Sequence, residues 1–188
     1  MAKDLRIAAV ARIISIILFY PDFILGFAKT FSDEGVFGDD VLFSLPSSLV
    51  VLSAIMTVVL IIVDILWIRG FVLIGTNLKN RLLFVSSYFL IIVVTMFNGL
   101  SLISLDFPFD LVVGAIIFFF LGIVTVFFGI GILQLQDKFG GIATAYGVLA
   151  IIEGAALVSI FLSFLALILV LPISILGAII LFRAADKL

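Results

Sequence analysis

Long apolar runs with few charged residues between them are the feature that most constrains this chain. A transmembrane helix needs about 20 mostly apolar residues to cross a hydrocarbon core of roughly 30 Å, and six such runs fit between the polar breaks of the 188 residues. We expect membrane spans at about 5–28, 46–69, 81–101, 110–134, 142–161 and 164–183. Hydrophobic residues make up 65% of the sequence, whereas roughly half is usual in soluble domains. The sequence therefore predicts an all-α, polytopic membrane helix bundle of six transmembrane helices that form a single transmembrane domain, 1–188.

The boundary between the last two expected spans depends on one proline. Pro172 is the only proline between residues 142 and 182. If it marked the turn, about 11 residues, or roughly 16 Å of helix, would precede Arg183, which is too short to cross. We therefore expect the turn at 159–163 and a kink at Pro172 inside the last helix. By the same reasoning Pro21 should kink or end the first helix.

The distribution of basic residues predicts the orientation of the chain. Nine of its ten Lys and Arg residues fall on one side of the expected topology: Lys3, Arg6, Arg12, Arg69, Lys79, Arg81, Lys138, Arg183 and Lys187. Lys29 lies on the other side. Because Lys and Arg are retained in cytoplasmic loops, we expect a multi-pass protein of the cell membrane with both termini in the cytoplasm.

The residue types that are missing exclude several kinds of chemistry. The sequence has no cysteine and no histidine, so thiolate or imidazole catalysis and ligation of zinc or haem by these groups are excluded. It also has no phosphate-binding glycine motif and no basic run that could follow a nucleic acid. We therefore expect no enzyme activity, no cofactor, no metal site and no nucleic-acid partner.

Small residues recur at intervals of seven in two of the expected spans. Ala115, Gly122 and Gly129 lie in the fourth span, and Gly147 and Gly154 lie in the fifth. Helices in lipid associate by close packing at small residues. We expect these residues to pack the two helices against each other as a hairpin; the alternative is a seam between copies of the chain in a homo-oligomer.

Aromatic residues near the ends of the spans have the pattern of interfacial anchors. Trp67, Tyr88 and Tyr146 fall near the expected cytoplasmic ends, and Tyr20 falls near the outer end. Trp and Tyr are enriched at the two membrane–water interfaces. The pattern therefore predicts that these side chains anchor the bundle in the headgroup region.

Two opposite charges are expected inside the spans on the cytoplasmic side. Asp64 precedes Arg69 by five residues, about 7 Å of helix, and Arg12 has a comparable depth in the first span. Our hypothesis is an intramembrane ion pair between Arg12 and Asp64; the alternative is that both side chains extend to the headgroups. Asn98, farther along the third span, is expected to form a hydrogen bond across the bundle.

Glu153 is the strongest candidate for function. It lies about 11 residues into the fifth span, roughly 17 Å deep, close to the bilayer midplane. An ionised and unpaired carboxylate there would be costly. Tyr146 and Ala150 share its helix face. One interpretation is a neutral glutamic acid that forms a structural hydrogen bond across the bundle; the other is a proton- or cation-binding site that Glu153 forms with Tyr146.

One stretch of the sequence resembles a group of known proteins. The segment GIGILQLQDKFGGIATAYGVLAIIEGAAL, residues 129–157, combines two glycine-containing apolar runs with a short Gln/Asp/Lys loop. It resembles uncharacterised archaeal multi-span membrane proteins. The resemblance implies an archaeal origin and supplies no active-site residues.

Two classes of function fit these observations. The missing catalytic groups and the short loops favour a non-catalytic accessory or assembly subunit of a membrane complex. The alternative is a small-solute or ion carrier or channel, or the substrate-binding subunit of a transporter, that uses a carboxylate in mid-membrane. Compact six-span bundles of this topology are similar to the vitamin-binding components of energy-coupling transporters. The expected partners are the lipid bilayer and either other membrane subunits or further copies of the chain.

Overall fold

The computed structural model describes residues 1–33, 47–100, 102, 109–159 and 162–188. Its elements are α1 (Ala2–Asp33), α2 (Ser47–Asn77), α3 (Arg81–Leu100), α4 (Phe109–Leu133), the single-turn helix α5 (Gln136–Phe139), α6 (Gly141–Val158) and α7 (Ser163–Lys187). These residues contain helices and turns and no strand. The expected all-α class is confirmed.

Several of these helices have the length and composition of membrane spans. By hydropathy and length, the described residues contain five helices able to cross a membrane: 51–77, 81–100, 112–133, 141–158 and 164–187. They belong to α2, α3, α4, α6 and α7. The chain is therefore a membrane-embedded helical bundle. The first expected span, 5–28, falls within α1.

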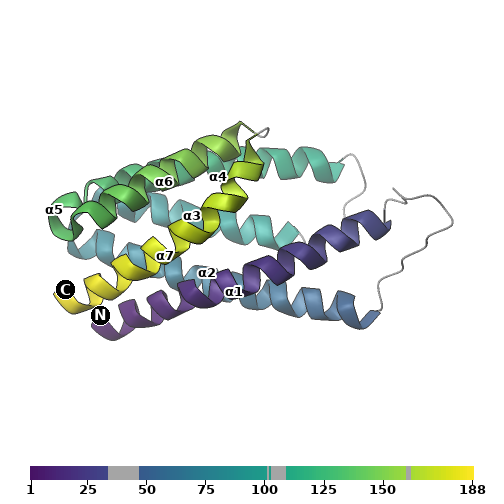
Figure 1. Cartoon of the computed structure of the whole chain (residues 1–188), viewed down its shortest axis with the longest axis horizontal. Coiled ribbons are helices and arrows are strands. Elements are labelled where there is room, and N and C mark those ends of the chain that lie inside the picture. The colour runs from purple at the N-terminus through teal and green to yellow at the C-terminus, as the bar shows by residue number, and fades with distance from the viewer. Residues whose placement is uncertain (34–46, 101, 103–108, 160–161) are drawn as a thin grey trace.

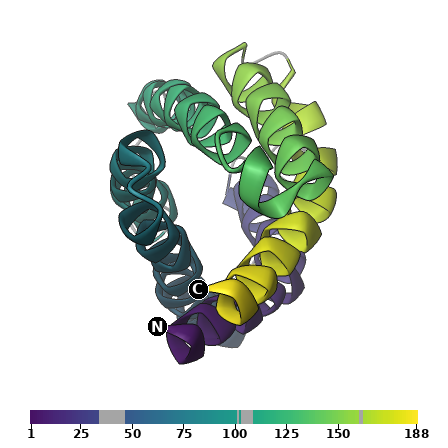
Figure 2. The ribbon, with the colours of Figure 1, turned by 90° about the vertical axis from the view of Figure 1, so that its left-hand side faces the viewer.

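The six long helices form a closed ring. Figure 2 shows the ring from the end at which both termini lie. Each long helix packs against the next one along the chain, and α7 returns to pack against α1. The most extensive contact joins α4 and α6. This arrangement gives every long helix one face toward a common centre.

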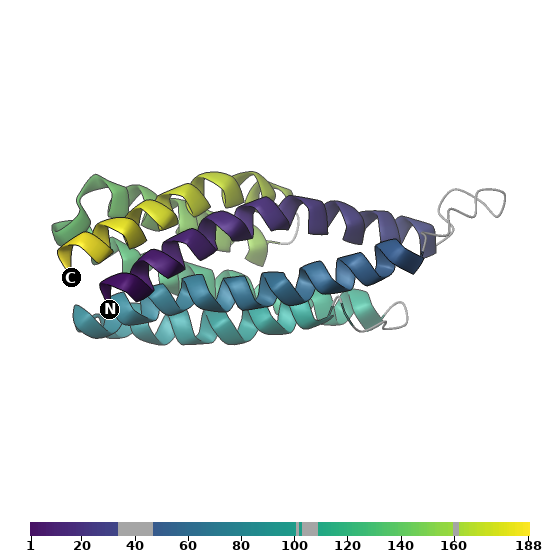
Figure 3. The ribbon, with the colours of Figure 1, turned by 90° about the horizontal axis from the view of Figure 1, so that it is seen from below.

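Both chain termini lie at the same end of the ring, beside α5 (Figures 1 and 3). A guanidinium nitrogen of Arg6 lies 3.1 Å from a carboxylate oxygen of Asp186, which joins α1 to α7. Lys187 donates a hydrogen bond of 2.9 Å to the carbonyl of Lys138, which lies in α5. At the first residues, a hydrogen bond from the terminal amine lowers the pKa of the Asp4 carboxyl.

Two helices are longer than the sequence analysis expects. α2 continues to Asn77 rather than ending near Arg69, because Phe71 and Ile74, which follow Arg69, are fully buried in the core. α1 passes through Pro21 and ends at Asp33. The apolar side chains beyond Arg69 thus extend the packed part of α2 by about two turns.

The break between the last two long helices falls where the sequence places it. α6 ends at Val158 and α7 begins at Ser163, and Pro172 lies inside α7. α7 can therefore keep a full-length apolar segment after the turn, as the length argument requires.

Glycines allow the backbones of α4 and α6 to come into direct contact. A Cβ atom on Gly122 would lie 2.6 Å from the carbonyl oxygen of Gly154, and one on Gly129 would lie 2.8 Å from that of Gly147. These four residues therefore face one another within one chain, as a hairpin requires, and each is covered by the opposite helix. Ala115, near the other end of α4, is half-buried.

A side chain also fixes the turn between α2 and α3. The Asn80 carboxamide accepts a hydrogen bond of 3.0 Å from the Leu83 backbone N–H at the start of α3, and it donates one of 2.8 Å to the Gly131 carbonyl on α4. Lys79, one residue earlier, has a positive φ of 53°. One buried carboxamide thus caps α3 and positions it against α4.

Candidate functional site

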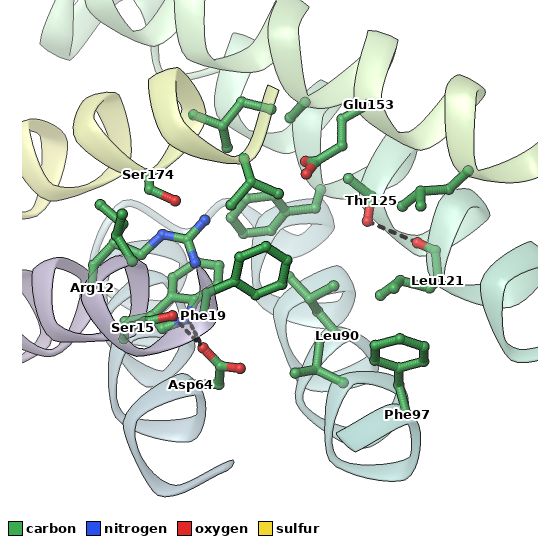
Figure 4. A pocket seen from close by; sticks show the side chains of 18 of the residues that line it. Arg12, Ser15, Phe19, Asp64, Leu90, Phe97, Leu121, Thr125, Glu153 and Ser174 are labelled. Carbon is green, nitrogen blue, oxygen red and sulfur yellow. Dashed lines mark hydrogen bonds between the residues drawn. The ribbon is translucent and has the colours of Figure 1, made fainter. Parts of the chain in front are cut away.

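A cavity of about 160 Å³ lies inside the helix ring (Figure 4). All six long helices contribute to its lining, and each supplies at least one polar side chain. These include Arg12 (α1), Asp64 (α2), Asn98 (α3), Thr125 (α4), Glu153 (α6) and Ser174 (α7). Polar groups in a membrane bundle are costly and tend to mark functional positions. The cavity is therefore the candidate site.

Asp64 is the best-satisfied polar group of the cavity. Its side chain is buried, with 7% of its surface exposed. One carboxylate oxygen accepts hydrogen bonds from the Ser15 hydroxyl at 2.8 Å and from the Trp67 indole N–H at 2.9 Å. The other oxygen accepts one from the Asn98 carboxamide at 3.2 Å. Asp64 thereby links α1, α2 and α3, and the expected cross-bundle bond of Asn98 is confirmed.

Arg12 does not form the expected ion pair with Asp64. The ion pairs of the described residues lie elsewhere, near the two termini. The guanidinium carbon of Arg12 instead lies 3.9 Å from the centroid of the Trp67 ring, in the geometry of a cation–π interaction. The reason for the difference is that one indole serves both charges: its N–H binds the carboxylate and its face binds the guanidinium.

Asp64 lies farther from the end of its helix than the sequence analysis expects. Because α2 continues to Asn77, 13 residues follow Asp64 in the helix, or about 20 Å. The carboxylate therefore lies near the middle of α2 and not close to its end. Arg12, ten residues after the start of α1 at Ala2, lies about 15 Å along its own helix. Both charged residues line the central cavity.

Two of the expected interfacial aromatics belong to the core. Trp67 and Tyr146 are only 6% and 1% exposed, and both line the cavity. Their rings pack edge-on against Phe128, with centroid distances of 6.5 Å and 6.1 Å. The interfacial role expected for Trp67 and Tyr146 is therefore wrong, whereas Tyr88 is half exposed, as an anchor would be.

Glu153 projects into the cavity from α6, on the side opposite Arg12 (Figure 4). Tyr146 and Ala150 line the same cavity, so the three residues share a helix face as expected. The positive charge of Arg12 acts on the Glu153 carboxylate through space. Within the described part of the chain, this carboxylate accepts no hydrogen bond, in contrast to Asp64. Here the structural bond expected by the first interpretation is not formed.

Two further buried polar atoms at the cavity have no partner in the described residues. They are Nε of Arg12 and the hydroxyl oxygen of Ser174, and the Ser174 side chain is completely buried. A buried donor without an acceptor is costly, at roughly 1–3 kcal/mol. By contrast, the Thr125 hydroxyl donates to the Leu121 carbonyl at 2.8 Å. Arg12 and Ser174 therefore each have an unused hydrogen-bond donor that a ligand could bind.

Sequence reasoning did not place several residues in the site, among them Ser15, Trp67, Thr125 and Ser174. Ser15 follows Arg12 by three positions and Trp67 follows Asp64 by three, which places each pair on one helix face. That spacing is a usable signal for both. Ser174 has no comparable signal, because a serine in an apolar helix ordinarily bonds to its own backbone.

Comparisons with protein-family models, with curated proteins and with solved structures found no match. The resemblance of residues 129–157 to archaeal membrane proteins thus stays a prediction. The chemistry of the site follows from its own side chains, which offer one guanidinium, several hydroxyls and one carboxylate without a hydrogen-bond donor among the described residues. No group of three or more Asp, Glu, His or Cys side chains in the described ranges could hold a metal ion.

Proposed function

We propose that this chain is a small-solute or ion carrier of the cell membrane, or the substrate-binding subunit of a transporter, and that Glu153 is its binding carboxylate. One observation carries the proposal. Of the two acids at the cavity, Asp64 is satisfied by three donors, whereas Glu153 faces the cavity and accepts no hydrogen bond within the described residues. A carboxylate held in this way can exchange a proton or a cation.

The topology we propose has six spans, with α1 as the first and both termini in the cytoplasm. The positive-inside rule supports it. Lys138 and Lys187 are in contact at the end of the ring where the termini lie, and Lys79 and Arg81 flank the turn that joins α2 to α3. In this orientation the cavity lies between the two membrane surfaces, as a carrier site requires.

The position of the polar groups favours a carrier over an accessory subunit. A subunit that only assembles with partners needs polar or small groups on its outer face, where a partner would sit. Here polar side chains from all six long helices converge on the centre of the ring instead. An inward-facing polar lining is the arrangement expected of a binding cavity between helices.

Native mass spectrometry of the protein purified from its own membranes tests this function. We expect the wild type to retain a small molecule or ion, and Glu153→Gln to lose it. The matched control is Asp137→Asn, which removes an exposed acid on α5 and should leave the retained molecule in place. A stoichiometric protein partner without any retained small molecule would contradict the carrier and support an accessory or assembly subunit.

A further inference from the structure

We propose that the cavity binds a small monovalent organic cation that carries an oxygen acceptor, of the amino-alcohol class. Its ammonium group binds Glu153, and its oxygen accepts hydrogen bonds from Arg12 and Ser174. This inference rests on the proposed function and names the substrate class of the same site. It follows from the charge balance, the unpartnered donors and the size of the cavity.

The charges of the cavity require one further positive charge. Arg12 carries +1, and Asp64 and Glu153 carry −1 each when ionised. Asp64 is satisfied by its three donors, and Arg12 lies over the indole that binds it, so these two charges offset each other. Glu153 remains as an excess negative charge at low dielectric, where an unpaired ion is costly. A monovalent cation neutralises the site, whereas a zwitterion leaves it at −1 and a divalent cation takes it to +1.

The unpartnered atoms define the other end of the ligand. Nε of a guanidinium can only donate a hydrogen bond, and a serine hydroxyl can also donate one. Arg12 and Ser174 line the same cavity, and Nε of Arg12 and Oγ of Ser174 have no partner among the described residues. Both atoms are covered by neighbouring groups, so a ligand oxygen reaches them only after a small side-chain shift. An oxygen acceptor on the ligand supplies what these two donors lack. An uncharged hydroxyl supplies that acceptor without disturbing the charge balance.

The size and walls of the cavity limit the ligand further. An engineered protein cavity of about 150 Å³ accommodates benzene, so a cavity of about 160 Å³ has room for a ligand of roughly six non-hydrogen atoms. Trp67, Phe128 and Tyr146 contribute aromatic walls. Such rings favour the methylene groups of an organic cation and attract its charge.

A proton and an ammonium group compete for the same carboxylate. The other charged or titratable side chains that line the cavity are Arg12 from α1, Asp64 from α2 and Tyr146 from α6 itself. The polar lining residues of α3, α4 and α7 are neutral. Glu153 can therefore hold a proton or the cation but not both, and binding of the cation to the protonated site releases a proton.

Isothermal titration of the purified full-length protein with ethanolamine tests the proposal. Ethylene glycol replaces the ammonium with a hydroxyl, ethylamine lacks the oxygen, and glycine is zwitterionic. We expect ethanolamine to bind, ethylene glycol and glycine to bind at least about tenfold more weakly, and ethylamine to bind about three- to tenfold more weakly. The affinity for ethanolamine should fall, by up to about tenfold per pH unit, as protons come to compete for the site.

Variants of Glu153 and Ser174 test the ammonium-binding end and the oxygen-binding end of the site separately. Glu153→Gln should weaken ethanolamine about 10- to 100-fold and remove the pH dependence, and Ser174→Ala should weaken it about three- to tenfold. Ser86→Ala is the matched control, because the Ser86 hydroxyl donates only to carbonyls of its own helix, and it should bind as the wild type does. Glu153→Asp keeps the charge, so it should retain measurable, pH-dependent binding even if Glu153→Gln does not fold.

Three results would overturn the inference. One is ethanolamine binding that Glu153→Gln leaves unchanged, and another is tighter binding of glycine or acetate than of ethanolamine. The third is a wild-type protein that retains a native small molecule but does not bind ethanolamine. In that last case the substrate class is wrong while the proposed carrier function stands. If the purified protein retains only a protein partner, both the substrate class and the carrier function are contradicted.

Discussion

Arg12 and Asp64 share one indole. The guanidinium of Arg12 lies over the Trp67 ring, 3.9 Å from its centroid, and the N–H of the same ring donates to Asp64 at 2.9 Å. If the two groups formed a direct ion pair, their oxygen and nitrogen atoms outside that pair would still need other hydrogen-bond partners. The indole instead gives each charge a favourable contact while it packs against the aromatic core.

Replacement of Trp67 separates these two contacts. Trp67→Phe keeps an aromatic face for Arg12 but removes the donor to Asp64, so we expect a loss of about 1–3 kcal/mol in stability. Trp67→Leu removes both and should cost about 0.5–2 kcal/mol more. Thermal unfolding in detergent measures the difference between the two variants. Equal stability of the Phe and Leu variants would show that the cation–π contact contributes nothing.

Exchange of the two charges should not restore stability. Arg12→Asp leaves a buried acid without a donor and should cost about 3–5 kcal/mol. The double variant Arg12→Asp with Asp64→Arg places a guanidinium among the donors that now bind Asp64, including the Trp67 indole, which can only donate. We therefore expect the double variant to unfold at least as readily as the single one. Rescue by the double variant would show a direct pair that the geometry lacks.

Apolar run length and helix rise were sufficient to predict most of the fold. Each of the six expected ranges corresponds to one long helix, although α1 and α2 extend beyond theirs, and the length argument alone located the break before Ser163. The glycines of α4 and α6 also meet as their spacing indicates. These features are local in sequence or repeat along one helix face, so a single chain carries enough information to find them.

The depth of polar groups could not be predicted in the same way. Arg69 follows an apolar run and looks like the end of a span, yet the apolar residues after it, such as Phe71, are buried by distant helices. Trp67 has the same local pattern as an interfacial tryptophan. Whether an aromatic or charged residue faces the headgroups or the centre of the ring depends on which helices close around it, and that is a property of the tertiary arrangement.

Alanine substitution at the α4–α6 contact should destabilise the bundle. A Cβ atom on Gly122 or Gly154 would lie 2.6 Å from a backbone oxygen of the opposite helix, which cannot rotate away. We expect Gly122→Ala and Gly154→Ala to cost about 1–3 kcal/mol each. Thermal unfolding in detergent, combined with size-exclusion chromatography, reports both stability and oligomer size.

Gly114 on α4 supplies the matched control for these substitutions. Apart from the backbone of its own helix, a Cβ atom there would meet no heavy atom of the described residues within 4 Å, so Gly114→Ala should change stability by less than about 1 kcal/mol. If Gly122→Leu folded normally and changed only the oligomer size, the glycines of α4 and α6 would pack between separate chains. Packing within one chain would then be the wrong explanation.

Cysteine labelling tests the proposed orientation. The sequence has no cysteine, so a single introduced cysteine reports its own position without background. Asn77 and Leu102 are both exposed; Asn77 is the last residue of α2, and Leu102 lies just after the end of α3. An impermeant maleimide applied to intact cells should label Leu102→Cys and should label Asn77→Cys only after the membrane is permeabilised.

The two positions are informative because a single helix, α3, separates them. If α3 crosses the membrane, Asn77 and Leu102 must lie on opposite sides, whichever way the bundle is oriented. Labelling of Asn77→Cys alone in intact cells would reverse the proposed orientation and keep the span. Labelling of both would show that α3 does not cross, and the central cavity would then no longer lie between the two membrane surfaces.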